Sequence, residues 1–195
     1  MIKLASLDVE RRERFKTCVH EAAHTVAARK NGLPVKWVSI DPDFIRNDPI
    51  AADAGCNAGD PVCMAIASHV LGPIIAQRRL ITKAEKEFVL GFGVQVLAGP
   101  IAEEVFDPAT YDIRTAGGDR EQIGSLLAIV LRSEGERKKF FNMIRRETGR
   151  FVAAHWIEIM FVAWHLQARR TIHEAEIDGL IAEGRARAED MKEAA

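Results

Sequence analysis

The sequence predicts a single, mainly helical domain with one small β element. Apolar residues recur at intervals of three and four over most of the chain, as they do on one face of a helix. Three Ser/Thr-x-x-Glu patterns mark helix starts: Thr82 with Glu85, Ser133 with Glu136, and Thr171 with Glu174. Only residues 35–40 are β-branched and aromatic enough to indicate a strand. The 195 residues, 48% of them hydrophobic, suit one domain over 1–195 with a core at about 7–182.

The expected elements follow in chain order. A first helix over 7–31 ends at Asn31-Gly32, because glycine readily takes the left-handed conformation that ends helices. The strand at 35–40 comes next, followed by an irregular loop over 41–62 of unassigned role. A second helix is expected to begin at residue 60 and to break near residue 72. Three more are expected over 82–106, 119–132 and 133–170. A last helix should begin at residue 171 and run into a charged tail at 183–195. The glycine pair Gly117-Gly118 ends a loop over 107–118.

The net charge, the apolar runs and the cysteine content exclude several classes of protein. The net charge of −1 lacks the cationic excess of a nucleic-acid-binding protein. The longest apolar run, 88–102, contains glycine and proline and is too short to span a bilayer, and no signal peptide is visible. The three cysteines Cys18, Cys56 and Cys63 fit a reducing compartment, and their spacing favours ordinary thiols over a second zinc site. We therefore expect a cytoplasmic protein that binds neither membrane nor nucleic acid.

One motif in the first helix carries recognisable chemistry. His20 and His24 are four residues apart, so their side chains stand one turn apart on the same helix face and can reach one metal ion. Glu21 is rotated by about 100° from His20 and can reach a water beside that ion. This H-E-x-x-H pattern is the zincin signature, in which two histidines bind Zn²⁺ and the glutamate is the general base. It predicts a zincin-like helical bundle with the β element next to the metal-binding helix; the alternative is a helix with two surface histidines.

A catalytic zinc site needs a third protein ligand, and the residues alone leave its identity open. The metzincin class is excluded because Ala27 and Lys30 stand where that class has glycine and histidine. The candidates are the carboxylates of Glu103, Glu104 and Asp119 and the imidazoles of His69, His155, His165 and His173. Asp119 can equally be a simple helix N-cap after two glycines, and the two glutamates can simply face solvent.

Four landmarks, in order, resemble the peptidase domain of the FtsH-type AAA+ zinc proteases. They are His20 to His24, the strand at 35–40, Leu97-Ala-Gly-Pro-Ile-Ala-Glu-Glu104 and Thr115-Ala-Gly-Gly-Asp119. The family has H-E-A-G-H, a short strand, Leu-Gly-Gly-Arg-x-Ala-Glu-Glu and Thr-Gly-Ala-x-Asn-Asp, and the likeness covers about residues 10–182. It implies that Asp119 is the third zinc ligand, and that Glu103 supports a ligand histidine by hydrogen bonding.

The resemblance implies a zinc-dependent metalloendopeptidase that hydrolyses peptide bonds in unfolded proteins or peptides. His20, His24 and Asp119 would hold Zn²⁺, and Glu21 would activate a zinc-bound water. The alternative is a non-catalytic zincin-fold protein with a binding or regulatory role. The intact Glu21 argues against it, because a purely structural zinc site has no use for that carboxylate.

The sequence departs from the family in ways that concern substrate handling more than the metal. It shows no AAA+ module and no transmembrane segment, so we expect a separate ATPase or self-assembly into a homo-oligomer to serve the polypeptide substrate. Ala23, Pro100 and Gly118 replace the family's glycine, arginine and asparagine. The loop at 41–62, with Cys56 at its centre, does not match the family's sequence.

Overall fold

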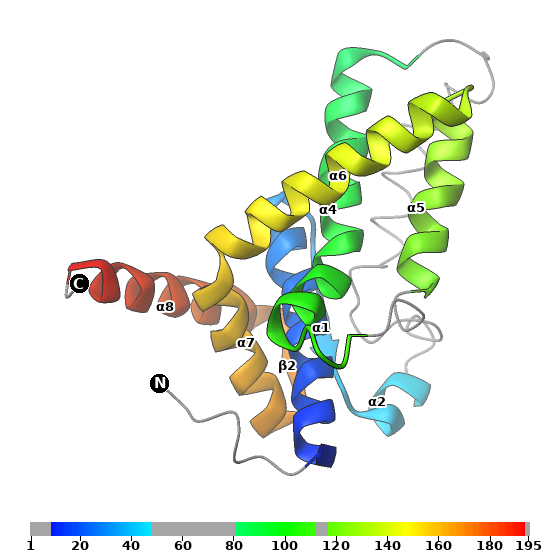
Figure 1. Cartoon of the computed structure of the whole chain (residues 1–195). Coiled ribbons are helices and arrows are strands. Elements are labelled where there is room, and N and C mark those ends of the chain that lie inside the picture. Colours follow the sequence, from blue (N-terminus) through cyan, green and yellow to red (C-terminus); the bar gives the residue numbers. More distant parts are fainter. Residues whose placement is uncertain (1–8, 48–80, 112–116, 194–195) are drawn as a thin grey trace.

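A computed structural model describes residues 9–47, 81–111 and 117–193. These ranges contain seven helices and two short strands (Figure 1), which confirms the mainly α class. The helix expected from residue 60, most of the loop at 41–62, and the side chains of Cys56, Cys63 and His69 lie outside the described residues.

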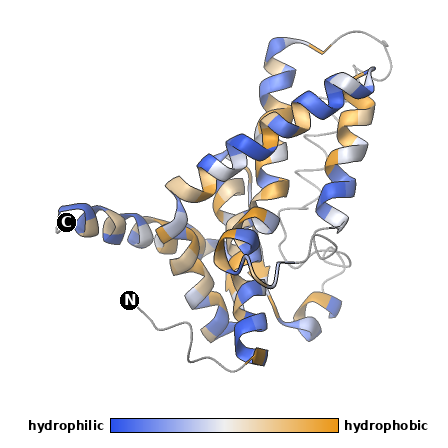
Figure 2. Ribbon diagram, viewed as in Figure 1, coloured by the Kyte–Doolittle hydropathy of each residue, from blue (hydrophilic) through white to orange (hydrophobic). Residues whose placement is uncertain are grey.

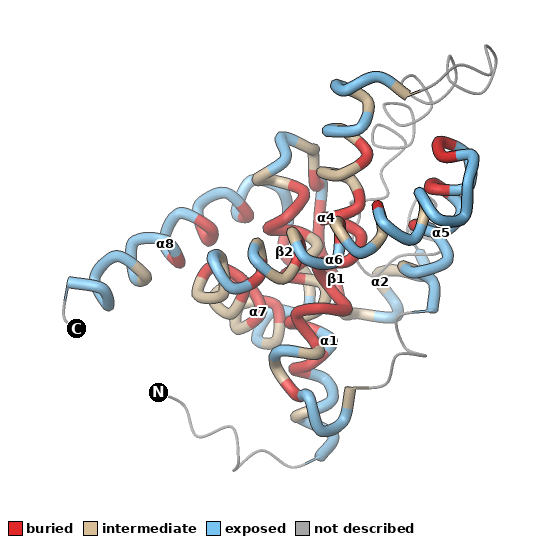
Figure 3. Tube along the Cα trace, turned by 45° about the horizontal axis from the view of Figure 1, so that its top comes forward, coloured by how far each residue is buried: buried red, intermediate tan, exposed pale blue. Residues whose placement is uncertain are grey.

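Helix α1 (Val9–Lys30) lies at the centre of the molecule, packed against α4 (Lys83–Phe106) and α7 (Trp156–Arg169) (Figure 3). Its buried side includes apolar residues at helical spacing: Phe15, Val19, Ala22, Ala23, Val26 and Ala27. The predicted end is also correct: Gly32 has a φ of 72°, and the Leu33 N–H donates to the Ala28 carbonyl at 2.9 Å. The histidine motif therefore lies on a helix that is held from several sides.

The predicted strand forms β1 (Trp37–Ser39), but its partner was not predicted. It pairs antiparallel with β2 (Thr171–His173), so that Ser39 lies opposite Thr171. Residues 171–173 were expected to open the last helix, and that prediction is wrong. The Thr171 and Ser39 hydroxyls share a hydrogen bond of 2.7 Å, so strand pairing uses the group that would have capped the helix. Helix α8 (Glu174–Glu193) begins after the strand and includes the described part of the expected charged tail, residues 183–193.

Local capping signals correctly predicted two helix starts. The hydroxyls of Thr82 and Ser133 accept from the backbone N–H groups of Glu85 and Glu136, at 3.3 and 3.1 Å. They open α4 and α6 (Glu134–Ala154). Polar and apolar residues alternate along α6 (Figure 2), whereas α4 is apolar between its charged ends. Among the described helices, α4 is the one long and apolar enough to cross a bilayer, but 67% of its most apolar window is buried inside the protein. Its composition therefore suits a core helix.

The expected helix over 133–170 is two helices, α6 and α7, with a break at His155. The break lets α6 contact α4 while α7 contacts α1 and α8. The largely apolar residues 151–164 are buried on one side only. Ile159 and Val162 are inaccessible to solvent, while Trp156 is partly exposed.

Two predicted loops contain helical residues. The loop from residue 41 begins with α2 (Pro42–Asn47), because the Asp41 carboxylate caps the Asp43 N–H at 3.1 Å and proline suits the first helical position. Helix α5 (Gly117–Val130) begins at the glycine pair rather than at 119. Asp119 therefore lies inside the first turn of α5 and not before it.

A buried carboxylate ties α1, α7 and α8 together. Glu158, 4% exposed, lies 3.1 Å from Lys30 Nζ, 3.2 Å from Arg185 Nε and 2.6 Å from His155 Nδ1. Burial raises the pKa of Glu158, but the hydrogen bonds from Lys30 and Arg185 outweigh it and leave the pKa lowered. Its stabilising effect is therefore present above the unfolded pKa of about 4.3 and is lost as the pH falls through the folded value.

Replacing Glu158 by glutamine should lower the free energy of unfolding at neutral pH by about 1–3 kcal/mol, because Lys30 and Arg185 lose their shared anion. Urea unfolding measures the loss. The matched control is Glu147→Gln on α6, a half-buried carboxylate, 31% exposed, that pairs with two exposed arginines. Exposed ion pairs contribute little, so equal losses at the two positions would contradict the role assigned to Glu158.

Candidate metal centre

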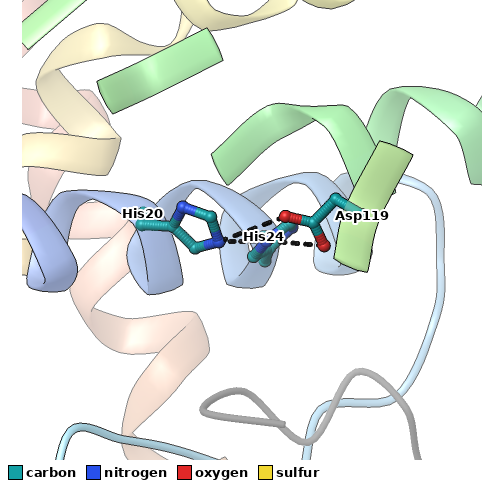
Figure 4. Close-up of side chains that lie close together, drawn as sticks. All are labelled: His20, His24 and Asp119. Carbon is teal, nitrogen blue, oxygen red and sulfur yellow. Dashed lines mark hydrogen bonds and ion pairs between the residues drawn. The ribbon is translucent and has the colours of Figure 1, made fainter. Parts of the chain in front are cut away.

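The two histidines of the motif meet an aspartate from a different helix (Figure 4). His20 and His24 project from the same side of α1, with their Nε2 atoms 2.9 Å apart. Asp119, in the first turn of α5, places its carboxylate oxygens 3.5 Å from His20 Nε2 and 3.8 Å from His24 Nε2. One ligand atom from each residue lies within 4.8 Å of the others. The structure thus brings together the three residues that the sequence singled out.

The spacing of these atoms fits a tetrahedral zinc ion. Zinc binds imidazole nitrogen and carboxylate oxygen at about 2.0–2.2 Å, so two ligand atoms on one tetrahedral ion lie about 3.3 Å apart. The observed separations of 2.9, 3.5 and 3.8 Å scatter around that value. The three side chains are 15%, 12% and 23% exposed, which leaves one side of the centre accessible from solvent. The donor set and its geometry therefore suit a metal with one open position.

The outer ring nitrogens of both histidines face oxygen atoms of α4. His24 Nδ1 donates to the backbone carbonyl of Gln95 at 2.8 Å, which leaves the lone pair on Nε2, the nitrogen that faces His20 and Asp119. His20 Nδ1 lies 3.0 Å from the Glu103 carboxylate. Glu103 and His20 are thus within ion-pair distance, and the hydrogen bond expected between Glu103 and a histidine stays a prediction. Acceptors of this kind set the tautomer and orientation of metal-binding imidazoles.

The remaining candidates for the third ligand have other neighbours. Glu104 pairs with Arg145 of α6 at 3.3 Å, on the protein surface. His155 contacts Glu158, His165 packs on the ring of Phe161, and His173 packs on that of Phe44. Glu103 faces the Nδ1 side of His20, away from the nitrogen that faces Asp119. Among the described residues, Asp119 is thus the carboxylate that faces both Nε2 atoms.

The two histidines have opposite protonation preferences. For His20, burial disfavours the charged form, but the neighbouring carboxylates of Asp119 and Glu103 outweigh it and raise its pKa to about 10. Burial and the neighbouring charge on His20 lower the pKa of His24 to about 4. The raised pKa favours the protonated form of His20 at neutral pH, with Nε2 close to both His24 Nε2 and Asp119 Oδ2. A metal held by His20 and His24 would displace the proton from His20 Nε2.

Zinc binding should consequently release at least one proton per site at about pH 8, because the metal replaces the His20 proton and ionisation of zinc-bound water adds to the count. The sign follows from the raised pKa: below about pH 10 the metal competes with a proton, so affinity should rise about tenfold per pH unit from neutral pH upward. Titration calorimetry in buffers of different ionisation enthalpy counts the protons. A count near zero would mean that His20 is already neutral, or that it does not bind the metal.

Glu21 lies beside the centre in a partly buried position. Burial raises the pKa of Glu21 most, the carboxylates of Asp119 and Glu103 add to the rise, and the charge on His20 opposes it; the resulting pKa is about 7. A carboxylate in this range is a better proton acceptor near neutral pH than an ordinary glutamate. A bound divalent cation would lower this value, because it favours the charged form.

Gly99 is a residue of the centre that the sequence analysis did not single out. A Cβ atom built on Gly99 would lie 2.4 Å from His24 Nε2 and 2.7 Å from His20 Nε2. The α4 backbone therefore forms a wall directly against the two nitrogens, and only a residue without a side chain keeps that space open. The glycine was visible within the Leu97–Glu104 landmark, but its spatial role depends on contact with another helix.

A scan against protein-family models and a search of the curated proteins both find no match to this chain.

Proposed function

We propose that this protein is a zinc-dependent metalloendopeptidase with a zincin-like, FtsH-like fold. The observation that carries the proposal is the convergence of His20, His24 and Asp119 on one point, with the carboxylate of Glu21 on the adjacent helical position. Two imidazoles and one carboxylate with one open side match the ligand set of catalytic zinc sites. A glutamate with a pKa near 7 matches the needs of a general base.

Each residue has a distinct part in the proposed reaction. His20, His24 and Asp119 would hold the ion, and Glu103 and the Gln95 carbonyl keep the histidine rings in place. Zinc supplies a Lewis acid, which makes water acidic enough to attack near neutral pH and polarises the scissile carbonyl. Glu21 accepts a proton from the attacking water and passes it to the leaving amine.

The small exposed fraction of the His20, His24 and Asp119 side chains limits which substrates can reach the centre. Side chains that are 12–23% exposed are reached by a single extended chain but not by the surface of a folded domain. Unfolded segments and peptides are therefore the proposed substrates. We propose a cytoplasmic enzyme that works with a separate ATPase or as a homo-oligomer, without nucleic acid or membrane.

The first experiment is zinc analysis of the purified protein together with cleavage of an unfolded substrate such as casein. We expect about one zinc per chain, loss of cleavage with a chelator, and recovery when zinc is restored. Asp119→Ala should weaken zinc binding by about 100-fold or more, since two histidines alone hold the ion poorly. Undiminished zinc affinity in Asp119→Ala would exclude Asp119 as a ligand. Zinc binding with no cleavage of any unfolded substrate would favour the non-catalytic alternative.

A further inference from the structure

Helices α1 and α4 run antiparallel and share a line of polar contacts that we call the polar seam. It consists of three pairs: Arg12 with Asp107, His20 with Glu103, and His24 with the carbonyl of Gln95. The α1 residues of the three pairs are separated by multiples of four residues. Their α4 partners are separated in the same way and follow one another in the opposite direction along the chain. The seam therefore follows a single face of each helix along their whole contact.

Two further directional contacts lie near the ends of this interface: the edge contact of the Phe15 and Phe106 rings and the hydrogen bond from the Asn31 side chain to the Gly91 carbonyl. The α1 surface beside the histidines is made of small apolar residues such as Ala22 and Ala23, and the α4 surface includes Ala98 and Gly99. Contacts between small apolar groups are non-directional, so they tolerate sliding of one helix along the other. A slip of one helical turn moves a side chain by about 5 Å, whereas metal coordination tolerates deviations of only about 0.5 Å.

The Arg12–Asp107 pair lies at the end of the seam away from His24. Arg12 Nη2 is 2.8 Å from Asp107 Oδ2, and Asp107 is 1% exposed although the Arg12 side chain is 42% exposed. Asp107 is also fixed by the backbone, because it caps α4 by donating its N–H to the Glu103 carbonyl at 2.9 Å. Sliding of α1 would separate this buried carboxylate from the Arg12 guanidinium, which is costly, although Thr110 and the charge of Lys16, one turn further along α1, also stabilise Asp107. The pair therefore opposes any shift of α1 along α4.

We propose that Arg12 and Asp107 are positioning residues whose ion pair sets the register of α1 on α4, and through it the placement of His20 and His24 against Glu103 and Gly99. The expected effect of this register on metal binding rests on the proposed function, since the register matters most when the two histidine rings must bind one metal ion. The register itself is a property of the metal-free chain and can be measured there.

The test compares Arg12→Met, which keeps the apolar stem and removes the charge, with the conservative Arg12→Lys. A double variant, Arg12→Met with Asp107→Asn, removes the unpaired carboxylate and so keeps the test valid if the single variant folds poorly. The matched control is Arg29→Met, which breaks another α1 ion pair, with Asp178 of α8, outside the seam. Thermal unfolding reports the structural cost of each change.

The metal-free measurement is the histidine tautomer, read by long-range ¹H–¹⁵N NMR of imidazole-labelled protein. In the wild type, Arg12→Lys and Arg29→Met, His24 should carry its proton on Nδ1, as required by the bond to Gln95. In Arg12→Met and the double variant, the tautomers of His24 should become mixed. With Co²⁺ as the probe, the same two variants should bind about 10–100-fold more weakly and lose the wild-type tetrahedral spectrum, whereas Arg29→Met should not.

The outcomes separate the two proposals. If Arg12→Met and the double variant keep the wild-type His24 tautomer, the positioning role is wrong whatever the metal does. If the His24 tautomers become mixed in Arg29→Met as well, and to the same extent as in Arg12→Met, then the ion pairs of α1 act only through general stability. The inference fails in that case too. If the wild type binds neither Zn²⁺ nor Co²⁺, the proposed function fails while the tautomer measurement still decides the register.

Discussion

Replacing Glu21 with glutamine should abolish peptide-bond cleavage while zinc stays bound. Glutamine has the same shape but cannot accept a proton, so the reaction loses its general base. The expected fall in kcat is about 10²–10⁴-fold, the contribution typical of general acid–base catalysis. Burial and the neighbouring carboxylates raise the pKa of Glu21 to about 7. The fall in kcat should therefore be specific to this position. Cleavage of a fluorogenic casein and zinc analysis of the same sample measure both parts.

The matched control is Glu104→Gln. Glu104 lies next in sequence to Glu103 but pairs with Arg145 on the surface, so its loss should change cleavage by no more than about twofold. Equal activity in the wild type and Glu21→Gln would show that the observed cleavage does not use this centre. With zinc bound in both proteins, that result would favour a binding or regulatory role.

Replacing Gly99 with alanine should empty the centre without unfolding the protein. The new methyl group would lie 2.4 Å from His24 Nε2 and 2.7 Å from His20 Nε2, so both rings must turn away from the position where they face Asp119. We expect zinc affinity to fall by about 100-fold or more, with loss of cleavage. The metal-free protein should keep its helical content, because alanine favours a helix over glycine by about 1 kcal/mol.

Gly91→Ala on the same helix is the control. A Cβ there would meet its nearest neighbour, the Asn31 side chain, at an ordinary 3.6 Å. It carries the same gain in helix propensity and no clash with the histidines. Normal zinc affinity in Gly91→Ala together with a loss in Gly99→Ala would locate the effect at the centre. Normal affinity in both variants would show that the rings do not need this space.

The features predictable from the sequence are those that depend on neighbours three or four residues apart. The capping boxes at Thr82 and Ser133 and the alignment of His20 with His24 are contacts of this kind, and all are present. Asp119 was selected through a motif resemblance and not through any local rule. Its position opposite the histidines depends on how α5 packs, which the residues around it do not encode.

The features that were missed depend on contacts between distant segments. Strand β2 forms because Thr171 meets Ser39, 132 residues away, and the helix break at His155 lets the chain pack on two different partners. The role of Gly99 likewise appears only when α4 lies against α1. In each case the local propensity permits two structures and tertiary packing decides between them.

The pairing of β1 with β2 has a consequence for synthesis of the chain. Ribosomes add about 5–20 residues per second, so Ser39 waits roughly ten seconds for the partner that lies 132 residues later. During that time α1 also lacks α7, which covers one of its sides in the finished fold. The histidine helix, although made first, is therefore completed among the last. A nascent chain released before residue 156 should carry every residue of the candidate centre and yet lack the α7 surface on which the histidine helix packs.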